Sequence, residues 1–251
     1  APTVVVPPAL RRPIAPPPGY GAVHVSERAE ASDGDRGAGR DTVILRTPGV
    51  VFLTSGSTGG PKPVFRSMDA VLAQARALNA ALPAPPRAIL DVLPLSGSQG
   101  FVNGLLQAAV SGARLGLVAR PDHRSILEAF AGGYDVVSLT PFFASLLARC
   151  PIPSPAPAAP PVVRVAGGRL PEAVCSAFRS RFGVTLQPQY GTSEYGTISL
   201  APNAPDAMNP DTVGWPLPGV EICVGDRPGA PCPPGTPGRL WVRTPWRMAW
   251  P

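Results

Sequence analysis

The sequence Val50-Val51-Phe52-Leu53-Thr54-Ser55-Gly56-Ser57-Thr58-Gly59-Gly60-Pro61-Lys62 joins an apolar run to a loop of glycines and hydroxyl residues. The apolar residues predict a buried strand, and the glycines after it allow the backbone to turn tightly and present its N–H groups to an anion. Lys62 closes the loop and is the only lysine in a chain with 22 basic residues. A mobile ammonium with three donors at this position indicates a phosphate-binding loop.

This loop differs from the P-loop of nucleoside triphosphatases. That motif needs Gly immediately before its lysine and Ser or Thr immediately after it, whereas this chain has Pro61 and Pro63. The alternative interpretation is a solvated turn between two elements, which describes most short Gly/Ser runs. We favour the phosphate loop because hydroxyl residues, glycines and the single lysine all fall in one short stretch.

Between Val50 and Leu200, apolar runs of strand length alternate with segments of helical periodicity. Ser67 is expected to cap the first helix, and Pro171 to be the first residue of the last one. Repeated strand, helix and strand produce a largely parallel sheet with flanking helices, so the sequence predicts an α/β fold. The expected strands are 50–53, 89–93, 115–118, 136–139, 162–166 and 184–187, and the expected helices are 68–82, 101–110, 125–130, 142–149 and one from 171.

Three regions of the chain differ in composition. Residues 1–41 are expected to form a loosely structured lead-in that is rich in Pro and Gly and carries partial strands. Residues 42–202 carry the α/β pattern of the expected nucleotide-binding core. Residues 203–251 change to short β runs separated by Pro/Gly turns, which indicates a small, truncated β-rich portion. Because the chain begins without methionine and stops within an extended pattern, we expect a fragment of a longer protein.

Two further loops follow predicted strands. The first, Pro188-Gln189-Tyr190-Gly191-Thr192-Ser193-Glu194-Tyr195-Gly196, offers a flat aromatic face, a hydroxyl and a carboxylate suited to Mg²⁺. The second, Ala166-Gly167-Gly168-Arg169-Leu170-Pro171, has two glycines that permit a flat ligand to lie against the backbone. Each loop could also be an ordinary turn. Ligands of open α/β sheets bind beyond the carboxyl ends of the strands, which is where both loops are expected.

Taken in order, the three loops resemble those of the adenylate-forming acyl-CoA synthetase superfamily, also called AMP-binding enzymes. The resemblance runs from Val43 to Met248 and includes 213–220 and 238–242. It implies an incomplete adenylation domain, whose parent enzyme uses ATP to convert a carboxylic acid into an acyl-adenylate and pyrophosphate. Transfer of the acyl group to coenzyme A or to a carrier-protein thiol is expected to follow, which makes the parent an acid-thiol ligase. An acyl or aryl acid is the expected substrate, and fatty acid metabolism the expected context.

The resemblance also implies roles for the matching residues. The first loop would hold the β- and γ-phosphates of ATP, and Lys62, Ser193 and Glu194 would be the catalytic residues. Tyr190 would pack on adenine, Ser193 would contact the α-phosphate, and Glu194 would bind Mg²⁺. Such a site works by positioning and electrostatics, because a carboxylate is already a nucleophile. The expected nucleotide site consists of Thr54, Ser55, Gly56, Ser57, Thr58, Gly59, Gly60, Lys62, Gly167, Gly168, Arg169, Tyr190, Gly191, Thr192 and Ser193.

The chain departs from the family's pattern at Gly97. Relatives commonly read Pro-Leu-x-His-x-x-Gly, whereas this chain reads Pro94-Leu95-Ser96-Gly97-Ser98-Gln99-Gly100, so the size and gating of the acid pocket are open. The sequence also stops before the family's ribose-binding Asp and C-terminal catalytic Lys. As given, the chain is expected to bind nucleotide weakly and to catalyse poorly.

Two other functions fit parts of the sequence. Ser96-Gly97-Ser98-Gln99-Gly100 after a strand mimics the nucleophile elbow of a serine hydrolase with Ser98 as nucleophile, but the only later histidine, His123, precedes a helix far from the end of the chain. A non-catalytic nucleotide-binding remnant is the other alternative, because expected parts of the family's domain are missing.

Composition excludes several classes of protein. The net charge is +6, but the arginines are scattered and aromatics make up only 6%, so no nucleic-acid surface is expected. No apolar run approaches the roughly 18 residues of a membrane span, and no leader resembles a signal peptide. The four cysteines, at 150, 175, 223 and 232, lack metal-ligand spacing and are expected to be thiols of a reducing compartment. We therefore expect a cytoplasmic protein.

Overall fold

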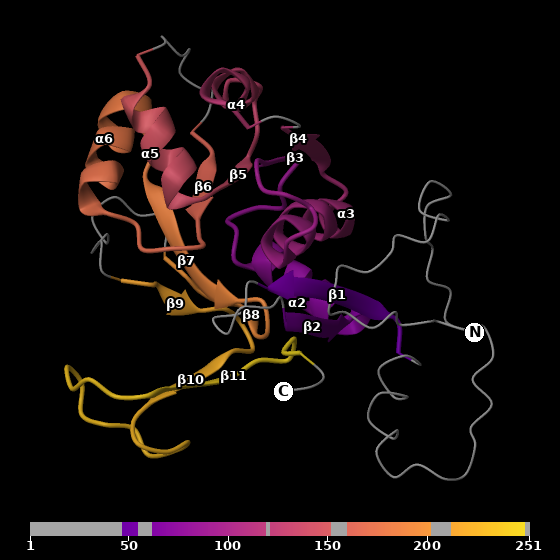
Figure 1. Cartoon of the computed structure of the whole chain (residues 1–251), viewed down its shortest axis with the longest axis vertical. Coiled ribbons are helices and arrows are strands. Elements are labelled where there is room, and N and C mark those ends of the chain that lie inside the picture. Colours follow the sequence, from indigo (N-terminus) through magenta and orange to yellow (C-terminus); the bar gives the residue numbers. More distant parts are fainter. Residues whose placement is uncertain (1–46, 55–61, 119–120, 152–159, 202–211, 249–251) are drawn as a thin grey trace, which may run out of the picture. The chain divides into compact units, whose positions relative to one another are not determined.

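The computed structural model describes residues 47–54, 62–118, 121–151, 160–201 and 212–248 (Figure 1). The chain divides into two units, 1–48 and 49–251, and only Thr47 and Pro48 of the first are described. The expected lead-in over 1–41 therefore lies outside the described residues. The division into lead-in, core and β-rich portion stays a prediction.

A sheet of seven strands, counted over the described residues, forms the centre of the second unit. Strands β3 to β7 pair in parallel, and β8 and β9 extend one edge antiparallel. The predicted α/β fold with a largely parallel sheet is confirmed. The strand order is β4-β3-β5-β6-β7-β8-β9, with β3 (Ala88–Asp91), β4 (Arg114–Leu117), β5 (Val136–Leu139), β6 (Val162–Val165), β7 (Leu186–Thr192), β8 (Gly196–Leu200) and β9 (Trp215–Pro216).

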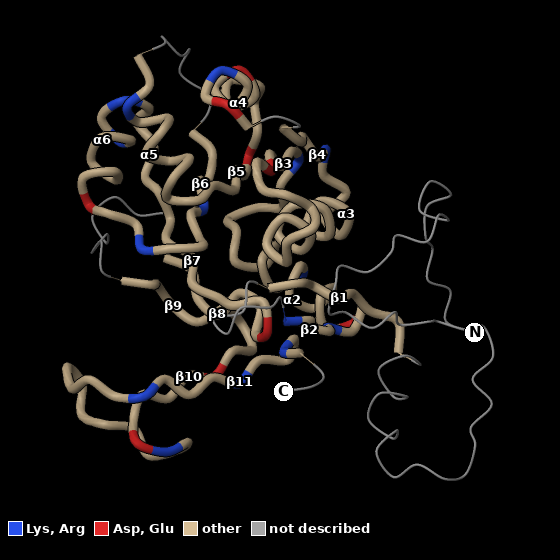
Figure 2. The backbone as a smooth tube through the Cα atoms, viewed as in Figure 1, with Lys and Arg blue, Asp and Glu red and all other residues tan. Residues whose placement is uncertain are grey.

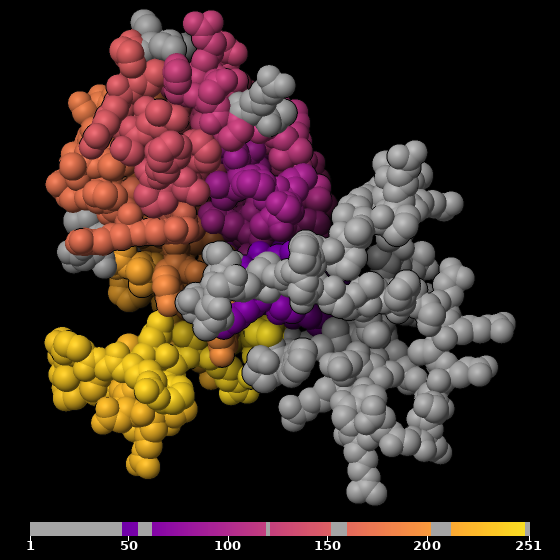
Figure 3. All heavy atoms as spheres, in the orientation of Figure 1, coloured from indigo at the N-terminus to yellow at the C-terminus, as the bar shows by residue number. Residues whose placement is uncertain are grey.

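Helices cover both faces of this sheet, so residues on both sides of its central strands are buried. Neighbouring residues of one strand point to opposite faces, so Leu90 packs with α4 to α6 while Ile89 packs with α3. In the space-filling view α4, α5 and α6 form one continuous surface (Figure 3). One face carries α4 (His123–Phe130), α5 (Pro141–Arg149) and α6 (Glu172–Phe182), and the other carries α2 (Met68–Ala80), the π-helical segment η2 (Gly100–Leu106) and α3 (Gln107–Ser111).

Two antiparallel hairpins lie outside this sheet: β1 (Gly49–Thr54) with β2 (Lys62–Ser67), and β10 (Glu221–Val224) with β11 (Leu240–Arg243). The prediction of a buried strand at 50–53 was wrong about burial, because only Phe52 is buried while Val51 and Leu53 are 55% and 69% exposed. The apolar run resembles a central strand of a sheet, but in the structure it pairs with β2 in a two-stranded hairpin. Periodicity in the sequence did not predict β2.

Several predicted boundaries also moved. The expected helix 101–110 is π-helical as far as Leu106 and α-helical after it. Pro171 is the cap before α6 and not its first residue. The strand expected at 184–187 continues through Pro188 to Thr192, because the Pro188 carbonyl accepts a hydrogen bond from Ala201 N at 2.8 Å and the chain stays extended. Ser67 does cap α2, since its hydroxyl accepts from Ala70 N at 3.2 Å.

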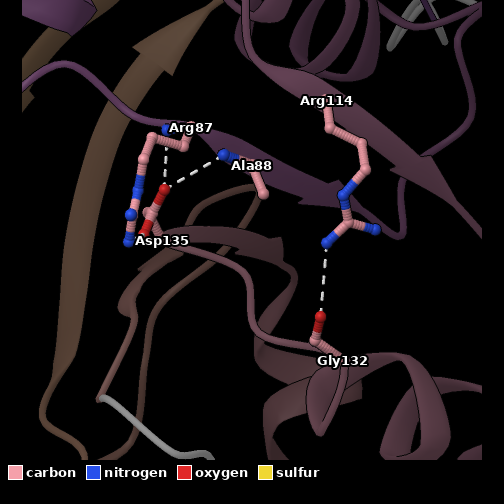
Figure 4. Close-up of polar contacts among 5 residues, drawn as sticks. All are labelled: Arg87, Ala88, Arg114, Gly132 and Asp135. Carbon is pink, nitrogen blue, oxygen red and sulfur yellow. Dashed lines mark hydrogen bonds and ion pairs between the residues drawn. The ribbon is translucent and has the colours of Figure 1, made fainter.

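Polar contacts join the amino ends of β3 and β4 to the segment just before β5 (Figure 4). The Asp135 carboxylate accepts hydrogen bonds from Arg87 N at 2.6 Å and Ala88 N at 3.0 Å, and Arg114 Nη2 donates to Gly132 O at 3.2 Å. These contacts occupy one end of the sheet and leave its carboxyl end for a ligand. Among the described residues, no helix combines the length and apolar character that crossing a membrane requires.

Asp91 is an unusual buried group at the carboxyl end of β3. Its side chain is 1% exposed; Oδ1 accepts a hydrogen bond from Leu93 N at 3.0 Å, and Oδ2 has no hydrogen-bond partner. A Cβ at Gly104 of η2 would collide with this carboxylate. Burial raises the pKa of Asp91 to about 7, so the neutral carboxylic acid is favoured in the folded chain only below that pH.

The aromatic packing between α4 and α6 yields the first prediction. Phe178 is fully buried, with its ring centroid 6.1 Å from that of Phe130 and 4.6 Å from that of Phe182. Phe178→Ala should lower the free energy of unfolding by about 3–5 kcal/mol in denaturant titrations, because it leaves a cavity. Phe142→Ala is the matched control: that ring is 69% exposed, and its loss should cost below about 1 kcal/mol. Similar losses in the two variants would contradict the packing.

Asp91 yields a prediction about pH. Because its pKa is about 7 in the folded chain and ordinary in the unfolded one, the folded state binds more protons between about pH 4 and 7. The free energy of unfolding should therefore decrease as pH rises through that window and level off above it. Asp91→Asn should flatten the profile, by a difference on the order of 2 kcal/mol between pH 5 and 7.5. Denaturant titrations at both pH values test this, and parallel profiles for the variant and the original chain would contradict it.

Candidate active site

A cavity of about 220 Å³ opens where β3, β6 and β7 end. Loops and hairpins that follow these strands supply most of its walls, as expected for a ligand site of an open α/β sheet. Gln74 of α2 also lines the cavity. The other lining residues are Ser98, Gln99 and Asn103 around the start of η2, Ala166 and Gly167 after β6, and Gln189, Gly191, Thr192, Ser193, Gly196 and Thr197 of the β7–β8 hairpin.

The tight turn between β7 and β8 positions Ser193. Tyr195 N donates to the Thr192 hydroxyl at 3.2 Å, and Gly196 closes the turn with a φ of 66°. A side chain at Gly196 would also collide with Gln74, so glycine is required there on two grounds. The turn brings Ser193 close to the residues just before η2, where Ser98 Oγ and Ser193 Oγ are 3.3 Å apart.

The segment from Thr244 to Met248 forms hydrogen bonds to this turn. Thr244 Oγ1 donates to Tyr195 O at 3.3 Å, and Met248 N donates to Glu194 O at 2.6 Å. The Met248 side chain packs against the apolar cluster that contains Phe52 and Val64 of the β1–β2 hairpin. One segment therefore links the turn that carries Glu194 to the hairpin that carries Lys62.

A chain of buried polar groups lies beneath the cavity. Arg66 donates through Nε to Trp246 O at 2.9 Å and through Nη2 to Gln74 Oε1 at 2.6 Å. Gln74 Nε2 in turn donates to Asn103 Oδ1 at 3.2 Å and to Thr197 Oγ1 at 2.9 Å. Burial lowers the pKa of Arg66 to about 10, so the guanidinium is still charged at neutral pH. The base of the cavity is thereby fixed to strand β2.

The predicted site residues fall into three groups. Gly167, Gly191, Thr192 and Ser193 line the cavity together, from two loops far apart in sequence. Residues 55–60, which hold most of the predicted phosphate loop, lie outside the described residues. The remaining predicted residues are described but do not line the cavity: Thr54, Lys62, Gly168, Arg169, Tyr190 and Glu194.

The ends of the phosphate loop are nevertheless placed. Thr54 and Lys62 face each other across the β1–β2 hairpin, and the Thr54 hydroxyl donates to Lys62 O at 3.2 Å. The loop between them thus connects two paired strands. Tyr190 alternates with Gln189 along β7, so the two side chains leave opposite faces of the sheet. The roles assigned to these residues stay predictions.

Sequence reasoning missed the amide side chains of the cavity. Gln74 lies on the buried stripe of α2 between Val71 and Leu78, and it is 2% exposed. Gln189 and Thr197 are similarly buried within strands. The sequence did contain a signal: these polar residues fall at positions where helical or strand periodicity predicts core. Because buried polar groups need hydrogen-bond partners, such residues indicate a polar site.

The hydrolase alternative has no support in the structure. The Ser98 hydroxyl bonds to the Ser193 hydroxyl and lines the cavity described above. His123 lines a different pocket, with Phe142 and Cys150 between α4 and α5. A nucleophile elbow needs its histidine within hydrogen-bond reach of the serine.

A magnesium ion fits the site only beside a nucleotide. In the described part of the chain, no three His, Cys, Asp or Glu side chains gather as a metal centre. Mg²⁺ at nucleotide sites is commonly held by one or two carboxylates together with phosphate oxygens and water. Glu194 directly follows Ser193 of the cavity wall but does not itself line the cavity, so its role as a magnesium ligand stays a prediction.

Comparisons with known proteins agree with this geometry. A salicylyl-CoA synthase/salicylate adenylyltransferase of a Streptomyces species is 29% identical over 204 residues, and the match covers 78% of this chain and 37% of that protein. A 4-coumarate–CoA ligase of Rhodobacter capsulatus is 30% identical over 172 residues, covering 65% of this chain and 43% of the ligase. The amide bond synthetase McbA from Marinactinospora thermotolerans superposes with a TM-score of 0.66 at 30% identity, over 80% of this chain and 41% of that chain.

The chain therefore spans less than half the length of each of these three relatives. The model of the AMP-binding enzyme family matches residues 22–249, which is most of the sequence. This match includes every loop that lines the cavity. The chain belongs to the AMP-binding enzyme family.

Proposed function

We propose that the whole protein containing this chain activates a carboxylic acid with ATP, forming an acyl-adenylate and pyrophosphate. The observation that carries the proposal is the cavity at the carboxyl ends of β6 and β7, lined by Gly167 and by Gly191 to Ser193. Membership of the AMP-binding enzyme family supports it. The names of the relatives, which include a salicylate adenylyltransferase and a 4-coumarate–CoA ligase, point to the same chemistry.

In the proposed reaction a carboxylate oxygen of the acid attacks the α-phosphorus of ATP. The bond from that phosphorus to the oxygen bridging to the β-phosphorus breaks, and pyrophosphate leaves with the electron pair. No proton is transferred, so no general base is required. The protein contributes by orienting the acid in line with the leaving group and by stabilising negative charge on the phosphoryl oxygens.

The residue roles form part of the proposal. Lys62 and the loop before it hold the β- and γ-phosphates, and the Ser193 hydroxyl donates to an α-phosphate oxygen. Tyr190 stacks on adenine, and Gly167 lets the ligand approach the backbone after β6. The Glu194 carboxylate holds Mg²⁺, which neutralises charge on the phosphates. The link through Met248 between the Glu194 turn and the β1–β2 hairpin supports joint action of Lys62 and Glu194.

We further propose that a thiol accepts the acyl group, which makes the protein an acid-thiol ligase. The thiol sulfur of coenzyme A or of a carrier protein would attack the acyl carbon, and AMP would leave as the thiol proton is released. The relatives named as CoA synthase and CoA ligase support this step. The proposal places the reaction in the cytoplasm. It involves no nucleic acid, because Lys and Arg are spread over α4, α6, β2 and the β10–β11 hairpin and do not form one basic stripe (Figure 2).

ATP binding separates this proposal from a remnant without nucleotide affinity. With Mg²⁺ present and ATP at 100 times its dissociation constant, the free energy of unfolding of the 251-residue chain should rise by about 2.7 kcal/mol. The gain should be smaller for Lys62→Ala at the same ATP concentration and unchanged for Arg124→Ala, an exposed residue of α4. Thermal unfolding measures both. No stabilisation at any ATP concentration would contradict nucleotide binding.

Exchange of labelled pyrophosphate into ATP tests the catalytic roles. In the whole protein, Lys62→Ala should lower the acid-dependent exchange rate by about 100-fold or more, because one charge-assisted contact to the phosphates is lost. Glu194→Ala should raise the Mg²⁺ concentration needed for half-maximal rate. Arg124→Ala and Glu128→Ala, two exposed residues of α4, are matched controls and should leave the rate unchanged. Unaltered exchange in both site variants would refute the assigned roles.

A further inference from the structure

The described residues that line the cavity carry no charge: they are amides, hydroxyl residues, glycines and one alanine. The nucleotides of the proposed reaction are anions, and an adenylation site has to stabilise negative charge on phosphoryl oxygens. Lys62, which is assigned to the β- and γ-phosphates, does not belong to the lining. A positive charge that acts on the phosphate beside Ser193 would therefore lie behind the lining.

The guanidinium of Arg66 lies directly behind two residues of the lining, Gln74 and Gly196. Its Nη2 donates to Gln74 Oε1 at 2.6 Å. The same nitrogen is 2.9 Å from the point where a Cβ on Gly196 would be. Gly196 closes the turn that carries Ser193. The charge is thus bonded to one lining residue and adjacent to another, at the Ser193 side of the cavity.

Strand β2 carries both Arg66 and Lys62. The two residues are four positions apart, an even number, so their side chains leave the same face of the strand. At about 3.3 Å per residue, the positions are about 13 Å apart along β2. Lys62 stands where the strand leaves the phosphate loop, and Arg66 stands beside the Ser193 turn. One strand therefore supplies a cation at each of two places along the site.

No carboxylate in the described part of the chain compensates Arg66. Its hydrogen bonds go to two neutral acceptors, Gln74 Oε1 and Trp246 O, and the ion pairs found among the described residues lie elsewhere. Its Nη1 is buried and has no hydrogen-bond partner among these residues. Buried charges in proteins are ordinarily paired. An unpaired buried cation beside a cavity therefore indicates that the ligand of the cavity is an anion.

We propose that the phosphate of the bound nucleotide next to Ser193 supplies the counter-charge that Arg66 lacks. Arg66 is then a positioning residue: it touches no phosphate itself, and its field acts through Gln74 and Gly196. The field of a charge removed from water is only weakly screened, so it reaches a ligand one layer away. The inference rests on the proposed adenylation function and adds to it a residue that the three loop motifs do not contain.

The affinities of AMP and adenosine test this role, because the two ligands differ by one phosphate. Their ratio measures how strongly the site favours the charge of that phosphate. In calorimetric titrations of the whole protein, Arg66→Gln should lower the AMP-over-adenosine ratio by about 10-fold, since a neutral amide replaces the charge. Arg66→Lys retains the charge and should keep most of the ratio. If Arg66 only supports the structure, both ligands will weaken together, and an unchanged ratio in Arg66→Gln would overturn the proposal.

Arg164 provides the matched control. It is a second guanidinium that is almost completely buried, with 1% of it exposed, and it donates to Gln107 Oε1 at 3.0 Å and Leu78 O at 3.2 Å. None of these three residues lines the cavity. Arg164→Gln removes the same charge from an equally buried position and should leave the AMP-over-adenosine ratio nearly unchanged. A loss as large as that of Arg66→Gln would contradict a specific role of Arg66.

A double variant keeps the test decisive if Arg66→Gln does not fold. Arg66→Met combined with Gln74→Leu replaces both partners of one hydrogen bond by apolar groups of similar size, which stability tolerates better than the loss of one partner. The ratio should again fall by about 10-fold, and a ratio equal to that of the unaltered protein would overturn the proposal. If the unaltered protein binds neither AMP nor adenosine, the proposed function fails and the role of Arg66 falls with it.

Discussion

The structure around the candidate site depends on the guanidinium of Arg66, which is buried without a carboxylate partner. Arg66 is fully buried, and no Asp or Glu of the described residues pairs with it. A charge removed from water must be compensated by hydrogen bonds, and here the compensation comes from the Gln74 amide and the Trp246 carbonyl. These acceptors come from α2 and from the C-terminal segment. Their positions are therefore strictly constrained, and so is the base of the cavity above them.

This constraint explains how separate parts of the chain act as one site. The orientation of Gln74 is fixed by Arg66, and Gln74 in turn fixes Asn103 of η2 and Thr197 of β8. Trp246 returns a hydrogen bond from its indole N–H to Thr197 O at 3.1 Å. The hairpin with Lys62, the turn with Ser193 and the entrance of η2 are thus held by one continuous set of bonds, which is the preorganisation that catalysis by positioning requires.

The sheet and its helices could be predicted from sequence because their residues repeat with the right period and end at residues such as Ser67. The β2 strand could not, because one of its two buried positions holds a charged residue, Arg66, and Pro63 stands near its start. Three site loops were found through motif order, and two of them do meet at the cavity. The amide side chains of the cavity escaped prediction. Gln74 bonds to Asn103 and Thr197, which are 29 and 123 residues away, and local pattern carries no information about such pairs.

The hydrogen bond from Arg66 to the Trp246 carbonyl joins residues that are 180 positions apart in the sequence. This separation affects the order in which parts of the chain fold. As the chain leaves the ribosome, α2 and the β1–β2 hairpin emerge long before the carbonyl that Arg66 needs. Long-range contacts of this kind close late, because the intervening loop entropy must be overcome first. Until then burial of the Arg66 guanidinium is unfavourable, so the hydrogen bonds beneath the cavity do not form. A chain that ends before residue 246 lacks this acceptor, so we expect the buried network beneath the cavity to stay incomplete until the C-terminal segment is synthesised.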